Sequence, residues 1–437
     1  MKSRLPIALF VVAGLLLLPA CHSLPLVGGP HPSLVDGSAT PGFKDFDRRA
    51  RRGERLTVVF FGASLTWSAN ASDQQFTSYR AFVRDMLEEK YPKAHFRCID
   101  GAIGGTNSFL GAFRLQRDCL AYQPDLVFLD SSANDGLSSD DVFIRAAYES
   151  HVRRIIRDAN APVVIVAFPF MWDVNRGNTA GMKGLEAHHA IGRAYNVPVG
   201  DAVVLCQKLV REKTATINEL WPYDGVHPGD AGYKVFAQAA MQGFLDGVEN
   251  ERVCKAPEKM LNADTFMNWA RVRVSSLDKL PPGWKVTAPN RTAAWYDAMM
   301  TRWLDDETVV SNKPEVKDNE SKAVDPPSLT VKFNGEMVLL FGEKTEESCK
   351  YRILIDGKLP TREKDGKQVP IESFDANSKR FGGNVHLAEI VAHHLDPSVD
   401  HTLVIDPLFE DGKEQELRIE SICVAGGKAK VWLDQEE

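Results

Sequence analysis

The chain has 437 residues, of which 44% are hydrophobic and 25% are charged, so it can form two or three globular domains with buried cores. Its formal net charge of −7 argues against a protein that binds polyanions, and nucleic acid is excluded as an expected partner. This composition is ordinary for a globular protein, so the functional information lies in local motifs.

The first residues have the form of an export signal. A basic start precedes an apolar run from Leu5 to Ala20, which is slightly short for a transmembrane span. The segment Leu18–Cys21 resembles a bacterial lipobox, which implies lipidation of Cys21. We therefore predict a signal peptide over residues 1–20 and an exported protein anchored to a membrane through the lipid on Cys21. The alternative is an N-terminal helix that stays in the membrane as an anchor.

Residues 21–54 are rich in Pro, Gly and Ser and then turn basic, which predicts a tether between membrane and domain. Six cysteines remain besides Cys21, and an even number in an oxidising compartment permits disulfides. Cys349 and Cys423 lie in the same C-terminal region and are candidates for a pair, with buried free thiols as the alternative. The chain has no C-x-x-C motif, and no metal site is predicted.

Between residues 55 and 250, predicted strands and helices alternate. The strands are expected at 56–61, 94–99, 126–129, 162–168 and 197–200, and the helices at 76–90, 109–120, 141–157, 181–195, 202–213 and 231–248. This order predicts a parallel sheet with helices on both faces. Functional residues of such sheets gather at the carboxyl ends of the strands. Ser64, the pair Gly104-Gly105 and Asn134 each follow one of the first three strands, so we expect them at one edge.

Ser64 is the candidate nucleophile, because it follows an apolar strand that ends in a tight turn. A serine hydroxyl needs a base and donors for the oxyanion that forms when a carbonyl is attacked. His227 is the candidate base, and Asp224, three residues before it, can orient the imidazole. A backbone N–H of Gly105 and the side chain of Asn134 can serve as oxyanion donors. Taken singly, each residue also fits a structural role such as a turn, a cap or a surface histidine.

Four segments resemble, in the same order, the four motif blocks of the SGNH (GDSL-type) hydrolase family. They are GASLT at 62–66, GAIGGTNS at 101–108, SAND at 132–135 and DGVHP at 224–228. The resemblance implies a three-layer α/β/α fold of flavodoxin-like type, with Ser64 as nucleophile, His227 as base and Asp224 as supporting acid. Ala63 and Ser132 depart from the usual Asp and Gly of the family, but neither position supplies a member of the triad.

The same resemblance implies an oxyanion hole, and no metal or organic cofactor is implied. Its donors are the N–H of Ser64, the N–H of Gly105 and the side chain of Asn134, with Gly104 as the alternative glycine.

The last part of the chain has a different pattern. Residues 251–325 are predicted to be a connecting segment, and residues 326–437 an antiparallel β-sandwich of short strands with a hairpin at Asn334-Gly335. This domain resembles the jelly-roll accessory domains of secreted SGNH hydrolases that act on carbohydrate. Three tryptophans are candidates for stacking on sugar rings, with core packing as the alternative: Trp284, Trp295 and Trp303. Three histidines are predicted to be surface or core residues rather than a metal set: His393, His394 and His401.

Together these features predict an exported serine esterase that hydrolyses short acyl esters through an acyl-enzyme on Ser64. Acetyl groups on a polysaccharide are the favoured substrate. A lipase or thioesterase that acts on longer acyl chains is the alternative among enzymes. A glycan-binding protein on an inactive hydrolase scaffold, and a structural envelope lipoprotein, are the alternatives without catalysis.

Overall fold

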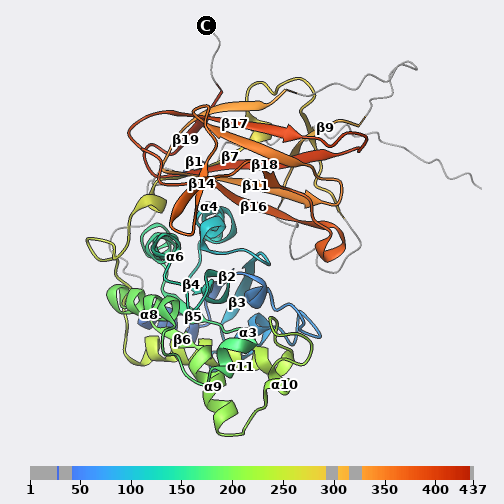
Figure 1. The fold of residues 1–437 in the computed structure, drawn as a ribbon. Coiled ribbons are helices and arrows are strands. Elements are labelled where there is room, and N and C mark those ends of the chain that lie inside the picture. Colours follow the sequence, from blue (N-terminus) through green and yellow to red (C-terminus); the bar gives the residue numbers. More distant parts are fainter. Residues whose placement is uncertain (1–26, 29–41, 292–303, 314–326, 434–437) are drawn as a thin grey trace, which may run out of the picture.

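A computed structural model describes residues 27–28, 42–291, 304–313 and 327–433. The predicted signal peptide and Cys21 lie outside the described residues. No helix among those described is both long and apolar enough to cross a bilayer. Figure 1 shows a domain of helices around a parallel sheet, with a second domain of antiparallel strands stacked on it.

The first domain is built on a five-stranded sheet in the order β3-β2-β4-β5-β6, with every neighbouring pair parallel. The strands are β2 (Arg55–Gly62), β3 (His95–Ala102), β4 (Leu126–Leu129), β5 (Val163–Ala167) and β6 (Val199–Asp201). Every residue of β4 and β5 is buried, as expected for apolar strands covered on both faces. The predicted three-layer α/β/α fold is confirmed, and β2, which leads to Ser64, is an interior strand between β3 and β4.

Helices cover both faces of this sheet: α3, α9 and α11 lie on one face, and α4, α6 and α8 on the other (Figure 1). The helices of the domain are α1 (Phe43–Arg51), α2 (Ser64–Trp67), α3 (Tyr79–Lys90), α4 (Ser108–Asp118), α5 (Ser132–Asp135), α6 (Val142–Arg154), α7 (Met171–Asn175), α8 (Lys183–Tyr195), α9 (Ala202–Arg211), α10 (Ile217–Leu220) and α11 (Asp230–Glu249). The six helices predicted from the sequence, which are α3, α4, α6, α8, α9 and α11, begin and end within three residues of their predicted bounds. Side-chain caps such as Ser78 and Asn107 fix the starts of two of them.

The segment before β2 differs from the predicted tether. Helix α1 packs on α11, with the rings of Phe43 and Phe46 at 6.1 and 5.5 Å from that of Phe244. The basic residues of α1 form ion pairs, and Arg49, for example, binds Asp125 at 2.6 Å. The two phenylalanines are three residues apart and so share one helix face, which buries them. The first domain therefore includes α1.

The second domain consists of two antiparallel sheets and a separate hairpin, β13–β14. One sheet has the order β1-β7-β18-β11-β16, with β9 attached to β18 and β8 to β9; the other has the order β15-β12-β17-β10-β19. The strands are β1 (Val27–Gly28), β7 (Trp269–Arg273), β8 (Lys285–Thr287), β9 (Glu307–Ser311), β10 (Leu329–Asn334), β11 (Met337–Thr345), β12 (Lys350–Ile355), β13 (Thr361–Lys364), β14 (Lys367–Pro370), β15 (Phe374–Asp375), β16 (Asn384–Ala392), β17 (His401–Leu408), β18 (Glu416–Ala425) and β19 (Lys430–Trp432). The predicted antiparallel β-sandwich is confirmed.

The predicted connecting segment, residues 251–325, contributes strands to this sandwich. Both β7 and β9 pair with β18, so the second domain begins well before residue 326. Trp284 is also part of the core, because only 4% of it is exposed and its indole N–H donates to the carbonyl of Pro327 at 2.8 Å. It is therefore not available for stacking on a sugar. Trp295 and Trp303 lie outside the described residues.

The hairpin predicted at Asn334-Gly335 is wrong. Strand β10 belongs to one sheet and β11 to the other, so the chain crosses between sheets at this point. The reason is the buried side chain of Asn334, which donates to the carbonyl of Val399 at 2.8 Å and accepts from the N–H of Lys428 at 2.7 Å. These bonds anchor the turn to distant loops instead of closing a two-residue hairpin.

The pairing of Cys349 with Cys423 is not formed, and all six described cysteines are free thiols. Cys349 belongs to the apolar core between the two sheets, whereas Cys423 belongs to the cluster between the two domains. The two thiols therefore lie on opposite sides of the sheet that contains β18, which explains why they do not meet. The alternative of buried free thiols describes all of them except Cys98, which is half-buried.

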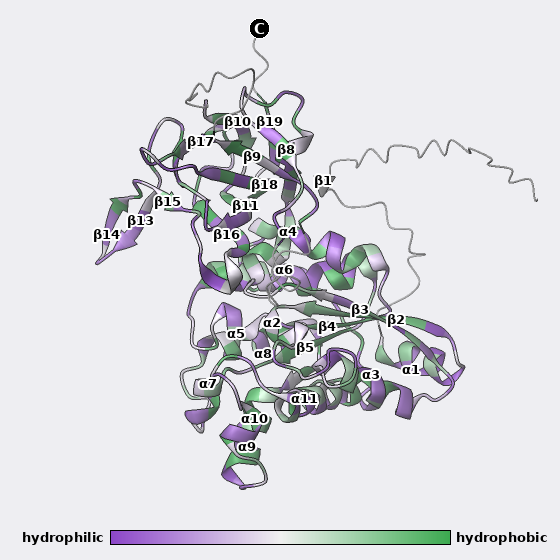
Figure 2. Ribbon diagram, turned by 90° about the vertical axis from the view of Figure 1, so that its right-hand side faces the viewer, coloured by the Kyte–Doolittle hydropathy of each residue, from purple (hydrophilic) through white to green (hydrophobic). Residues whose placement is uncertain are grey.

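An apolar cluster joins the domains. Helices α4 and α6 lie between the parallel strands and the sheet that contains β11 and β16, as Figure 2 shows from the side. Phe113 of α4 and Phe341 of β11 are both part of the cluster, and the guanidinium of Arg154 lies 4.5 Å from the ring centroid of Trp269. A large apolar contact of this kind opposes relative movement of the domains, so residues of both domains can form one site.

Candidate active site

Ser64 lies at the carboxyl end of β2, as the first residue of α2, and its side chain is almost buried. The turn that presents it requires Gly62. A Cβ atom on this residue would lie 2.1 Å from Oγ1 of Thr66 and 2.8 Å from the carbonyl oxygen of Asp130. The strand therefore bends sharply enough to place the Ser64 hydroxyl at the edge of the sheet.

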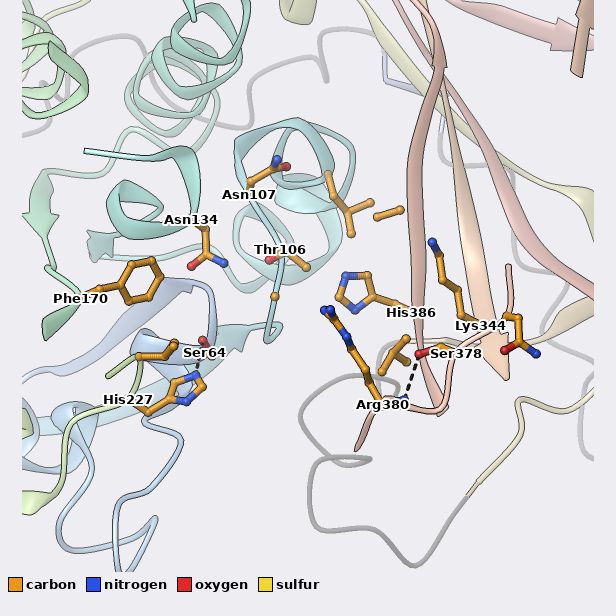
Figure 3. Close-up of a pocket in the computed structure, with 16 residues that line it drawn as sticks. Ser64, Thr106, Asn107, Asn134, Phe170, His227, Lys344, Ser378, Arg380 and His386 are labelled. Carbon is orange, nitrogen blue, oxygen red and sulfur yellow. Dashed lines mark hydrogen bonds between the residues drawn. The ribbon is translucent and has the colours of Figure 1, made fainter. Parts of the chain in front are cut away.

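His227 lies in the loop before α11 and points at Ser64, with its Nε2 atom 3.0 Å from the serine Oγ (Figure 3). Its Nδ1 atom lies 3.6 Å from Oδ2 of Asp224, which is close enough for electrostatic attraction but too long for a hydrogen bond. The structure thus brings together the three residues that the sequence suggested as a triad. This arrangement can remove a proton from the serine hydroxyl.

Asp224 is held by a residue that the sequence analysis missed. One carboxylate oxygen accepts the N–H groups of Val226 and His227, both at 2.7 Å. The other accepts the side-chain N–H of Asn70 at 2.8 Å. Asn70 has a φ of 72°, a left-handed conformation that asparagine tolerates better than most residues. Its position six residues after Ser64 is the only signal in the sequence, and that signal is weak.

These contacts shift the protonation of both groups. Partial burial raises the pKa of Asp224, but hydrogen bonds from His227, Asn70 and Val226 outweigh it and hold the pKa below its usual value. Burial lowers the pKa of His227, and the nearby Asp224 carboxylate offsets only part of that effect. His227 is therefore neutral at pH 7 and able to accept a proton.

Gly105 and Asn134 both line the cavity that contains Ser64 and His227. Gly105 has a φ of 72°, so the turn after β3 needs a residue without a side chain at this position. Gly104 is buried and does not line the cavity, which favours Gly105 as the glycine that faces a substrate. The predicted oxyanion donors therefore lie at one edge of the sheet, next to the nucleophile.

The cavity has a volume of about 530 Å³ and lies between the two domains. Figure 3 shows Ser64, Asn134, Phe170 and His227 on one side and side chains of the second domain on the other. The residues that the second domain contributes are Lys344, Asn377, Ser378, Arg380, Val385, His386 and Ala388. Sequence reasoning found none of them, because no motif connects them to the serine.

Residues 60–235 match the GDSL-like Lipase/Acylhydrolase family. This segment belongs to that family. The match includes Ser64, Gly105, Asn134 and His227, and it agrees with the parallel sheet and the cavity described above. The protein is a carboxylic ester hydrolase, since this acylhydrolase domain holds the serine, the histidine and the cavity.

Two solved structures resemble the chain over both domains. Both are of a two-domain esterase (CEX) active on acetylated mannans, and one was co-crystallized with mannopentaose. The first is 23% identical and covers 90% of this chain and 97% of its own, with a TM-score of 0.68. The second is 22% identical and covers 89% of this chain and 95% of its own, also with a TM-score of 0.68. The likeness is one of fold, and no curated protein matches the sequence.

Two carboxylates, Asp130 and Asp135, join the loops of the acylhydrolase domain. Asp130 accepts the hydroxyl of Thr66 at 3.0 Å and the N–H of Ser132 at 3.0 Å, which connects the nucleophile turn to the segment with Asn134. Burial raises the pKa of Asp130 to about 6. Asp135 accepts the N–H of Ser108 at 2.8 Å, and burial raises its pKa to about 8.

Arg114 of α4 binds the backbone at the ends of the two strands that lead into the site. Its buried guanidinium donates to the carbonyl of Gly62 at 2.6 Å and to that of Gly101 at 2.6 Å. It also lies 4.0 Å from the ring centroid of Phe61 and 3.3 Å from the carboxylate of Asp118. This one side chain therefore ties the ends of β2 and β3 together where the serine and glycine loops begin.

The shift at His227 predicts the pH dependence of hydrolysis. Only the neutral imidazole acts as a base, so kcat/KM rises with pH through the pKa of His227. Since burial lowers that pKa from 6.5, we expect the midpoint of the acid limb below pH 6.5. The measurement is kcat/KM for p-nitrophenyl acetate between about pH 4 and pH 8.

The variant Asp224→Asn provides a matched check on this prediction. Because the Asp224 carboxylate raises the pKa of His227, its removal should move the acid limb to still lower pH. An acid limb above pH 7 in the unmodified protein would contradict the assignment of His227 as the base.

Proposed function

We propose that this protein is an exported serine esterase that removes short acyl groups, acetyl groups above all, from polysaccharides. The observation that carries the proposal is the 3.0 Å contact between the Ser64 hydroxyl and the His227 imidazole. This pair lines the same cavity as Gly105 and Asn134, so the base, the nucleophile and the candidate oxyanion donors can all contact one bound ester group.

In the first half of the reaction, Nε2 of His227 takes the proton of Ser64 while the serine oxygen attacks the ester carbonyl. The N–H groups of Ser64 and Gly105 and the side chain of Asn134 stabilise the negative charge on the tetrahedral intermediate. Asp224 stabilises the imidazolium that forms. His227 then gives the proton to the leaving alcohol, and the acyl group stays on the serine.

In the second half, water takes the place of the alcohol. His227 accepts a proton from that water, and the hydroxide attacks the acyl-enzyme. The same donors stabilise the second tetrahedral intermediate, and its collapse releases the carboxylic acid and returns the proton to Ser64. No group beyond these residues is needed to balance the reaction.

A carbohydrate substrate is supported by the polar groups that line part of the cavity. The second domain contributes amide, hydroxyl, guanidinium and imidazole groups there, and a long acyl chain would instead favour an apolar tunnel. Trp172 is half exposed, and its ring centroid lies 4.7 Å from that of Phe170, which lines the cavity. Exposed aromatic rings of this kind stack on sugars. The two-domain esterase of similar fold, which is active on acetylated mannans, supports the same class.

The proposal includes export and attachment of a lipid at Cys21. Its support is the basic and apolar N-terminal pattern followed by the lipobox-like Leu18–Cys21. Labelling of cells with a palmitate analogue tests it. Label should enter the unmodified protein and be absent from the variant Cys21→Ser.

The catalytic proposal is tested by covalent labelling with a fluorophosphonate probe. The unmodified protein should label on Ser64, and Ser64→Ala should not label at all, since the probe reacts with activated serine hydroxyls. Turnover of p-nitrophenyl acetate beside p-nitrophenyl palmitate then reports on chain length. Acetate release from acetylated mannan reports on the polymer.

Each outcome decides one part of the proposal. Absence of labelling in the folded protein would contradict the esterase and favour a glycan-binding protein on a hydrolase scaffold. Labelling with a preference for palmitate would keep the triad but move the substrate to lipids.

A further inference from the structure

The side of the cavity that the second domain forms is cationic. Lys344 of β11 and Arg380 of the short helix η5 (Arg380–Gly382) both line it. None of the described residues that line the cavity is an aspartate or a glutamate. This distribution opposes the formal net charge of −7 of the whole chain, so it is not a consequence of overall composition.

Arg380 is the more available of the two cations. Lys344 has the carboxylate of Glu389 at 3.7 Å, which compensates part of its charge. Arg380 is exposed, and among the described residues no carboxylate pairs with its guanidinium, whereas Arg352 of the same domain pairs with Asp406. In Figure 3 the Arg380 side chain extends toward the side of the cavity that carries Ser64.

The position of Arg380 is fixed by its backbone. The N–H of Arg380 donates to the hydroxyl of Ser378 at 3.2 Å, and Gly383 ends the short helix with a φ of 77°. The backbone of Arg380 is therefore held in a defined turn, from which the side chain extends into the cavity. A guanidinium offers paired N–H donors whose geometry matches the two oxygens of a carboxylate or sulfate.

The two sides of the cavity divide the substrate between them. Ser64, Gly105 and Asn134 belong to the first domain and surround the point where the ester carbonyl must lie. A short acyl group is held there, so the part of the substrate that extends toward the second domain is the alcohol. A neutral sugar offers only hydroxyl oxygens to a guanidinium, whereas an anionic group at that position forms a charge-assisted pair with it.

We propose that Arg380, with Lys344 on the same side of the cavity, binds an anionic group on the alcohol part of the ester. The substrates are then acylated sugars that carry a carboxylate, as in a uronic acid residue, or a sulfate. This inference rests on the proposed esterase function and adds the charge of its substrate.

The test compares four esters: acetylated glucuronic acid, its neutral methyl ester, acetylated glucose and an acetylated glucose sulfate. We expect kcat/KM to be at least about tenfold higher for the charged esters than for the neutral ones, because one charge-assisted pair distinguishes them. The preference should fall when salt is raised to about 0.5 M. A preference for glucuronate over sulfate, or the reverse, identifies which anion the site takes.

The variant Arg380→Met should remove most of this preference, while Lys379→Met is the matched control. Lys379 is the exposed neighbour of Arg380 and does not line the cavity, so its loss removes the same charge without changing the ratio of rates. Equal rates on charged and neutral esters, or an equal effect of both variants on the ratio, would overturn the proposal.

A binding measurement keeps this test separate from catalysis. Calorimetry with the inactive variant Ser64→Ala compares the binding of glucuronic acid with that of glucose. Tighter binding of glucuronic acid, together with its loss in the double variant Ser64→Ala/Arg380→Met, would support the proposal without any turnover. If p-nitrophenyl acetate is not hydrolysed, the esterase function fails, but this binding result still decides whether the second domain recognises an anion. Equal binding of the two sugars would overturn it.

Discussion

Replacing Ser64 by Ala is expected to lower kcat/KM for p-nitrophenyl acetate at least ~10⁴-fold, and adding His227→Ala to lower it by less than about threefold more. The reason is the 3.0 Å contact through which the histidine activates the serine. Once the hydroxyl is absent, the base has no proton to accept. The residual rate comes from Gly105 and Asn134, which still bind the oxyanion in every variant.

The measurement is steady-state hydrolysis by Ser64→Ala, His227→Ala and the double variant. The control is His95→Ala, an exposed histidine at the start of β3 that does not line the cavity and should leave kcat/KM unchanged. If the double variant lost a further factor of about 100, the two residues would be acting independently and no triad would operate.

The parallel sheet and the edge on which the site lies were predictable from the sequence, because both depend on local patterns. Strands such as Val163–Ala167 are continuous apolar runs, and each is followed by a helix with an apolar face. Alternation then determines that the strands are parallel and that their carboxyl ends share an edge. Ser64 and Asn134 could be placed together without knowledge of any contact between them.

The supporting residues could not be predicted, because their partners are distant in the sequence. Asn70 binds Asp224 across 154 positions, and Arg114 binds the carbonyl of Gly62 across 52. Neither residue type indicates such a role on its own. Backbone carbonyls in particular leave no trace in the sequence, so a buried arginine that binds them resembles any other arginine of a helix.

The second domain illustrates a different limit. Asn334-Gly335 is a strong local signal for a hairpin, but the signal describes only the turn and not which strands pair. Tertiary contacts of the Asn334 side chain decided the pairing. The same domain places Arg380 and His386 at the cavity through the packing of its sheet on α4 and α6, which no local pattern encodes.

Replacing Arg114 by Met is expected to lower the free energy of unfolding of the acylhydrolase domain by about 3–5 kcal/mol. Methionine fills most of the space but removes the guanidinium donor from both strand ends, so the carbonyl of Gly101 loses that bond and the carbonyl of Gly62 keeps only the N–H of Ile103 at 3.2 Å. The partner carboxylate of Asp118 is not left alone, because Arg117 still binds it at 2.7 Å. The cost therefore arises mainly at the two strand ends that present the serine and glycine loops.

Urea unfolding, followed by tryptophan fluorescence, measures this effect. Arg157→Met is the control, since Arg157 is exposed and its replacement should change the unfolding free energy by no more than about 0.5 kcal/mol. Arg114→Lys should recover only part of the loss, because a single ammonium cannot donate to two carbonyls with the geometry of a guanidinium. A loss below about 1 kcal/mol for Arg114→Met would mean that water satisfies both carbonyls and that the strand ends do not depend on this side chain.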